Sequence, residues 1–131
     1  MSVTLRDCLK LPSLSLGKVI AGHKGLSSIV TTVSVLEFED GMEEDIMTPN
    51  ELLVSALFCL KDDVDAQCQF LRKCKHNGDV GLVLFYADMI LGNIDAKLLE
   101  TADLLNFPII LLPGKDMGLK YSDVIGESHI L

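Results

Sequence analysis

The sequence of 131 residues contains no tryptophan, and aromatic residues make up only 5% of it. Aromatic side chains provide the surfaces on which unpaired bases stack, so their scarcity argues against a site for single-stranded nucleic acid. Basic residues are also few, because 11 Lys and Arg stand against 19 Asp and Glu, a formal net charge of -8. Most of this surface should repel a phosphate backbone, and we expect no direct DNA binding by this chain.

Long apolar segments are missing as well. The hydrophobic fraction is 49% and the mean hydropathy is +0.38, yet the longest apolar runs have only the length of strands. A transmembrane helix requires roughly 20 apolar residues. The amino terminus, MSVTLRDCLKLP, carries charges where a secretory signal needs an uninterrupted apolar stretch. We therefore expect a cytoplasmic protein without a membrane segment.

The usual signatures of metal, nucleotide and nucleophilic chemistry are absent from the sequence. The four cysteines, Cys8, Cys59, Cys68 and Cys74, show no CxxC spacing and no paired histidines nearby, so we expect buried, reduced thiols and no metal site. There is no GxxxxGK[ST] or GxGxxG loop, and no GxSxG elbow accompanies the three histidines. We predict no cofactor and no catalytic residues.

One strand, helix, strand unit stands out in residues 79–113. Its two strand segments, 80–86 and 108–112, are almost wholly apolar without alternation, a pattern typical of parallel strands covered on both faces. Between them, Asp95 caps a predicted helix, and the step Asn106-Phe107-Pro108 ends it. The unit predicts an α/β layer structure.

A second unit overlaps the first. The turn Thr48-Pro49-Asn50 precedes a strand over 51–57, and a helix over 60–76 follows, capped by Asp62 or Asp63 and stopped at Asn77-Gly78. Two overlapping β-α-β crossover units predict an α/β fold with a largely parallel or mixed sheet flanked by helices. The length fits a single domain over residues 1–131.

The first third of the chain adds shorter elements. Thr4 and Asp7 form a weak capping box for a short helix, a strand is predicted over 16–22, and Gly25 supplies a turn before a β-branched strand over 29–35. The acidic segment 37–45 lacks the ligand spacing of an EF-hand, so it is either a solvated loop or a site for a cation or basic partner.

Candidate ligand contacts lie where the predicted strands end. An open α/β sheet places its binding crevice outside the carboxyl ends of its strands. The polar, aromatic or turn residues predicted there are Glu37, Ser55, Tyr86, Asp88, Pro113 and Gly114. Each also has a purely structural explanation, such as a surface charge for Glu37 or a small filler between helix and sheet for Ser55.

The order of several segments resembles the amino-terminal domain of the purine catabolism regulator (PucR-like) family. These segments are TLRDCLKLPSL, VIAGHKGLSSIVTTVSVLE, PNELLVSAL, HNGDVGLVLFY and LLETADLLNFPIILLP. The family's AGxxGL turn falls on Ala21, Gly22, Gly25 and Leu26, and its VxE strand end falls on Val35, Leu36 and Glu37. The pattern is also similar to the regulatory domain at the start of HPr kinase.

The resemblance implies a sensory domain of a cytoplasmic bacterial transcription regulator, with a small-molecule effector, purine-related by the family's name, and a homodimer as expected partners. An alternative is a regulatory domain attached to a metabolic enzyme or kinase, of HPr kinase or phosphotransacetylase-linked architecture. A small enzyme with Glu37 or Asp88 as acid or base is the third reading. Ser27-Ser28 replaces the polar pair, Asp plus a basic or amide residue, that usually follows the family's GL. Asn50 replaces a glycine, and the acidic segment replaces an apolar one. These departures bear on whether this chain binds the same ligand as other members of the family.

Overall fold

A five-stranded sheet forms the centre of the molecule. The computed structural model describes residues 3–11, 14–35, 50–57, 60–84 and 94–112. The spatial order of the strands is β2 (Lys18–Ala21), β7 (Ile109–Leu111), β6 (Gly81–Leu84), β5 (Glu51–Ser55) and β4 (Thr32–Val35). Strands β4 to β7 run parallel, whereas β2 is antiparallel to β7. The predicted α/β fold with a mixed, largely parallel sheet is confirmed.

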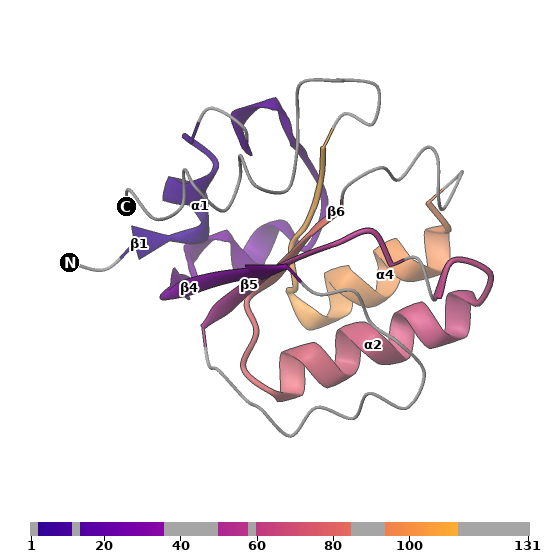
Figure 1. The fold of residues 1–131 in the computed structure, drawn as a ribbon. Coiled ribbons are helices and arrows are strands. Elements are labelled where there is room, and N and C mark those ends of the chain that lie inside the picture. The colour runs from indigo at the N-terminus through magenta and orange to yellow at the C-terminus, as the bar shows by residue number, and fades with distance from the viewer. Residues whose placement is uncertain (1–2, 12–13, 36–49, 58–59, 85–93, 113–131) are drawn as a thin grey trace.

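Two helices cover one face of this sheet. Helix α2 (Val64–His76) connects β5 to β6, and α4 (Ala96–Leu105) connects β6 to β7. They lie side by side and contact each other (Figure 1). Lys97 of α4 forms an ion pair with Asp65 of α2 at their exposed surface. Strands β5, β6 and β7 follow one another across the sheet without reversal, so successive crossovers of one hand place both helices on the same face.

The opposite face is covered by the amino-terminal part of the chain. It contains α1 (Leu5–Cys8), the 3-10 helices η1 (Leu14–Leu16) and η2 (His23–Ser27), and a small antiparallel pair of β1 (Val3–Thr4) and β3 (Ile29–Val30). Figure 1 shows α1 and β1 across the sheet from α2 and α4. The buried side chains of this layer form one cluster with Leu52, Val54, Val83, Ile110 and Leu112.

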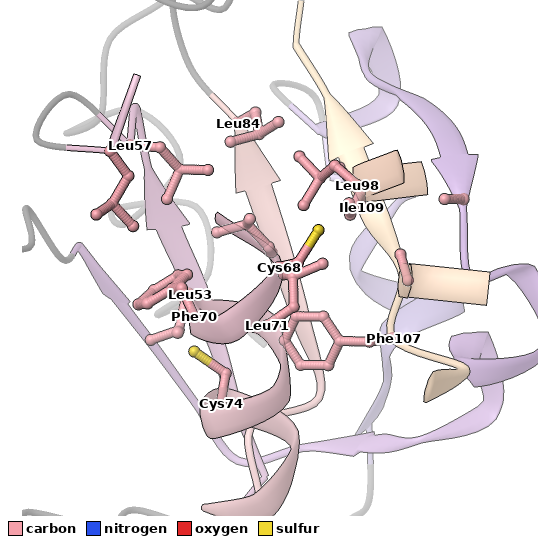
Figure 2. Close-up of a cluster of buried hydrophobic side chains, with 14 residues drawn as sticks. Leu53, Leu57, Cys68, Phe70, Leu71, Cys74, Leu84, Leu98, Phe107 and Ile109 are labelled. Atoms are coloured by element: carbon pink, nitrogen blue, oxygen red, sulfur yellow. The ribbon is translucent and has the colours of Figure 1, made fainter. Parts of the chain in front are cut away.

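Two cores explain why β6 and β7 contain no polar side chain. On β6, Leu82 and Leu84 pack toward the helices, while Val83 between them packs toward the amino-terminal layer. Ile109 and Ile110 of β7 divide between the two cores in the same way. Figure 2 shows the helix-side core, in which Phe107, Leu71 and Cys68 come together with strand side chains. Alternate residues of a strand face opposite sides, so a sheet covered on both sides requires continuous hydrophobicity.

The predicted helix caps are confirmed. Thr4 Oγ1 accepts a hydrogen bond from the Asp7 amide at 3.2 Å, and Asp7 Oδ2 accepts one from the Thr4 amide at 3.0 Å. Asp63 caps α2 by accepting from the Ala66 amide at 3.0 Å, and Asp95 caps α4 by accepting from the Lys97 amide at 2.8 Å. Each cap satisfies an amide that has no partner within its own helix.

The helix stops are also confirmed. After α2, Gly78 adopts a φ of 96°, and the Asp79 amide donates to the Cys74 carbonyl at 3.0 Å. After α4, Asn106 adopts a φ of 51°. A left-handed residue directly beyond a helix redirects the chain, and glycine and asparagine tolerate that conformation best. Asn50 before β5 is left-handed too, with a φ of 62°, as its place in the predicted turn requires.

Several predicted boundaries were wrong. The stretch 29–35 is not one strand, because β3 pairs with β1 and β4 pairs with β5 in a different sheet. The strand predicted from residue 16 begins at Lys18, after the 3-10 helix η1. Helix α2 begins at Val64 instead of residue 60, because Asp63 is the cap. Strand β6 (Gly81–Leu84) begins at Gly81 instead of residue 80, while residues 85 and 86 of the predicted strand lie outside the described residues and stay a prediction.

Helices long and apolar enough to span a membrane are not found in the described part of the chain. Cys8, Cys68 and Cys74 are buried free thiols, as predicted, and Cys59 lies outside the described residues. Burial raises the pKa of the Cys8 thiol to about 11, with a smaller contribution from the Asp7 carboxylate. At neutral pH this side chain is a protonated hydrophobic group and a poor nucleophile.

Candidate functional site

Strands β4 to β7 run parallel, so the sheet has a carboxyl end, where these strands finish, and an amino end, where they begin. The sequence predicted ligand contacts at the carboxyl end. Of the six predicted residues, the structure describes Ser55. The other five, Glu37, Tyr86, Asp88, Pro113 and Gly114, lie outside the described residues, and their role in ligand binding stays a prediction.

Ser55 ends β5 and is fully buried. Its Oγ accepts a hydrogen bond from the Leu57 amide at 3.0 Å. Leu57 is itself fully buried and adopts a φ of 55°, a left-handed conformation that is rare for a bulky residue. The hydroxyl therefore supports the turn after β5, and it would reach a ligand only if this turn opened.

Helix α2 is fastened to the same turn by a buried amide. Gln67 is 4% exposed, and its Nε2 donates to the Leu60 carbonyl at 2.9 Å. The Leu60 amide in turn donates to the Leu57 carbonyl at 3.0 Å. Buried polar groups that are satisfied in this way specify one arrangement of the chain. These hydrogen bonds link the carboxyl end of β5 to α2.

A pocket lies at the amino end of the sheet, opposite to the predicted site. It has a volume of about 300 Å³ and is lined by Gly22, His23, Lys24, Asp103 and Asn106. The first three come from the turn into η2, directly after β2, and the last two come from the end of α4. Because β2 is antiparallel to β7, the end of β2 meets the start of β7, and this brings the two segments together.

One hydrogen bond joins the two walls of the pocket. The Gly22 amide donates to Asp103 Oδ1 at 2.7 Å, across 81 residues of sequence. Gly22 has a φ of 71°, and a Cβ at this position would lie 2.3 Å from the Phe107 carbonyl oxygen. Only glycine combines this backbone conformation with so close an approach.

Gly25 is required for a second close contact between the same segments. A Cβ there would lie 2.1 Å from the Asn106 carbonyl oxygen. Its amide donates to the Gly22 carbonyl at 2.9 Å, which closes the turn. The glycines of the AGxxGL turn are therefore explained by packing against the chain between α4 and β7.

The pocket combines groups of both charges. Lys24 and His23 are exposed on the turn, and the Asp103 carboxylate and Asn106 amide face them from α4. Only one carboxylate oxygen of Asp103 is used by Gly22. The arrangement offers a cation, an acceptor and an amide to a small polar molecule, a typical way to fix its orientation. Groups of three or more His, Cys, Asp or Glu that could hold a metal ion are not found in the described ranges.

A further titratable cluster lies at the amino end, near the starts of β5 and β6. Burial, and then the Glu51 carboxylate, raise the pKa of Asp79 to about 6. Burial, and then the Asp79 carboxylate, also raise the pKa of the Cys74 thiol. Because the pKa of Asp79 is raised in the folded chain, the protonation of this side chain affects the stability of the fold.

The two segments joined at the pocket are two of the five that carry the family pattern. The purine catabolism regulatory protein-like family matches residues 7–130. The chain belongs to this family. It is 30% identical, over 131 residues, to a purine catabolism regulatory protein of Bacillus subtilis (strain 168), a match covering 98% of this chain. The match covers only 24% of that relative, so the chain spans about a quarter of its length.

His23, Lys24, Asp103 and Asn106 were not predicted as site residues, because no spacing rule places residues 23 and 103 together. Two signals pointed to them indirectly: the AGxxGL turn itself, and the asparagine that precedes Phe107-Pro108. The pairing that brings these residues together is the antiparallel one between β2 and β7, about 90 residues apart, and the sequence gives no local sign of it.

Proposed function

We propose that this chain is the non-catalytic sensory domain of a cytoplasmic bacterial transcription regulator and that it binds a small-molecule effector. The observation that carries the proposal is the uneven match to the Bacillus subtilis protein, which covers nearly all of this chain and about a quarter of the relative. A domain of this size within a longer regulatory protein fits an input module. The DNA-binding module would then lie elsewhere in a longer protein, which agrees with the acidic balance of this chain.

The pocket at the amino end is the favoured effector site. Its lining residues come from two segments of the family pattern, and it contains charged groups that the core does not require. The carboxyl end remains the second candidate through Glu37, Tyr86, Asp88, Pro113 and Gly114. Alanine variants of Lys24 and of Asp88 separate the two, because each should weaken effector binding at one end only.

A sensory role requires that binding at the pocket reaches other parts of the molecule. Helix α4 and strand β7 both run between the two ends of the sheet, and their junction forms one wall of the pocket. A ligand bridging the η2 turn and the end of α4 would favour one arrangement of these segments. A ligand shifts such an equilibrium only through its differential affinity for the two states.

Homodimer formation is part of the proposal. Leu104 on α4 is a large apolar residue and is 85% exposed. One exposed leucine is common on monomers too, so it serves here as the position at which the proposed contact is tested. Light scattering on the chain should give the mass of a dimer, and Leu104→Glu should reduce it to that of one chain if α4 forms the contact.

The effector is tested by thermal shift. Purine bases and their oxidised derivatives form the first panel, because the relative's name connects it to purine catabolism. A ligand present at a hundred times its Kd adds about 2.7 kcal/mol to the free energy of unfolding. The proposal predicts a saturable rise in Tm for at least one compound, and no rise for any member of the panel contradicts a purine-related effector.

A further inference from the structure

We propose that the pocket at the amino end selects a small carboxylate that carries a neighbouring amide N–H. The inference rests on the proposed sensory function and specifies the ligand chemistry of its favoured site. It follows from the charges and hydrogen-bonding groups that line the pocket.

The carboxylate of the ligand would be recognised by Lys24. This side chain is exposed at the rim, and within the described residues it forms no ion pair. His23 adjoins it and adds a ring nitrogen that donates a hydrogen bond. The chain as a whole has a net charge of -8, so a lysine beside a histidine stands out as a local attraction for an anion.

The amide N–H of the ligand would be recognised by Asp103. Its Oδ1 is held at 2.7 Å by the Gly22 amide, which fixes the carboxylate and leaves Oδ2 as an acceptor. Asn106 has a carboxamide that can donate to the ligand's own carbonyl oxygen. An anion without a donor group would meet the Asp103 carboxylate unfavourably, so the pocket discriminates against simple anions.

The size of the pocket limits the ligand. A volume of about 300 Å³ lies at the lower end of the range for ligand pockets, roughly 300 to 1,000 Å³. A short acylated amino acid or a single substituted ring fits this volume. An acidic peptide is a second possible source of a carboxylate for Lys24, and the test below distinguishes it from a small ligand.

The test uses N-acetylglycine as the probe, because it has one carboxylate, one amide N–H and one carbonyl. The measurement is a titration followed by the ¹H–¹⁵N resonances of the chain. We expect saturable shifts at the amides of Gly22 and Asn106, and at least a tenfold weaker affinity for N-acetylglycinamide, which lacks the carboxylate. Lys24→Met should weaken N-acetylglycine at least tenfold, while Lys75→Met, an exposed lysine at the end of α2, should change it less than twofold.

Three results would overturn the inference: shifts that map away from the pocket, equal affinity for the uncharged analogue, or no effect of Lys24→Met. Stronger binding of an acidic peptide than of N-acetylglycine would also overturn it in favour of a protein partner. If a purine derivative binds and Lys24→Met leaves it unchanged, this inference fails while the sensory function stands. If N-acetylglycine binds as expected but no purine derivative does, the pocket chemistry stands and the purine-related effector fails.

Discussion

The Gly22 amide donates a hydrogen bond of 2.7 Å to the Asp103 carboxylate and thereby fastens the turn after β2 to the end of α4. These residues are 81 positions apart, and each lies in a segment of the family pattern. The bond gives Asp103 a partner in the turn, while the left-handed conformation and the close approach to Phe107 require glycine at position 22. It also joins the two walls of the proposed site.

Asp103→Asn tests the charge in this bond. The variant can keep an oxygen acceptor near the Gly22 amide, but this oxygen belongs to a neutral group. A hydrogen bond to an ionised acceptor is stronger than one between neutral groups. We expect the free energy of unfolding to fall by about 1 kcal/mol in urea denaturation. Glu100→Gln on the exposed surface of the same helix is the matched control and should change it by less than about 0.5 kcal/mol. Equal effects of the two variants would show that the bond contributes nothing specific.

Gly22→Ala tests the close approach at the same turn. The new Cβ would lie 2.3 Å from the Phe107 carbonyl oxygen, and alanine would have to adopt a φ of 71°. Left-handed strain and the backbone clash together should lower the free energy of unfolding by about 2 kcal/mol or more. Lys24→Ala, two residues further on at an exposed position, should leave stability almost unchanged. A fully stable Gly22→Ala variant would show that the turn is not held against β7 as described.

Asp79 gives the fold a defined pH dependence. Its pKa is raised to about 6 in the folded chain, chiefly by burial and then by Glu51, from 3.8 as the ordinary value. The folded state therefore binds this proton more tightly than the unfolded state does. The stability that the folded state gains from this protonated carboxyl is fully present below about pH 4, and it is lost as the pH rises through about 6.

Asp79→Asn removes that dependence. Relative to the unchanged chain, the variant should be more stable at neutral pH, and the difference should shrink steadily toward pH 4, because protonated aspartate and asparagine are both neutral. Urea unfolding at several pH values measures it, with Asp62→Asn at an exposed position as the control. A constant difference at all pH values, or a less stable variant at neutral pH, contradicts the raised pKa.

Ser55→Ala tests the turn at the carboxyl end. Without the hydroxyl, the buried Leu57 amide loses the acceptor that lies 3.0 Å away. An unsatisfied buried amide costs about 1 to 3 kcal/mol of stability. Ser27→Ala, at an exposed position of η2, should have an effect below about 0.5 kcal/mol. If Ser55→Ala instead weakens effector binding without loss of stability, Ser55 is a ligand contact, as first predicted from the sequence.

The parts of the fold that follow from local chemistry were predictable. Thr4, Asp63 and Asp95 are caps because their side chains satisfy free amides within three residues, a relationship visible in the sequence. The continuous apolar runs of β6 and β7 indicated a sheet covered on both faces, and the division of Leu82 and Val83 between two cores confirms this. Such features depend on neighbours along the chain.

The parts that depend on distant pairing were not predictable. Nothing local in Lys18–Ala21 indicates that it pairs antiparallel with β7, or that residues 29–35 divide between two sheets. The pocket follows from that pairing, since it is formed where β2 and β7 meet. The sequence predicted ligand contacts at the carboxyl end of the sheet, and the pocket lined by described residues lies at the amino end.

Isothermal titration calorimetry of the 131-residue chain tests the sensory role most directly. Purine bases and their oxidised derivatives are titrated into the chain and into its Lys24→Met variant, with circular dichroism as the check that both are folded. The account predicts one saturable binding event per chain for at least one compound, weakened in the variant. Folded protein that releases or absorbs no binding heat with any compound of the panel would contradict the proposed sensing of a purine-related effector.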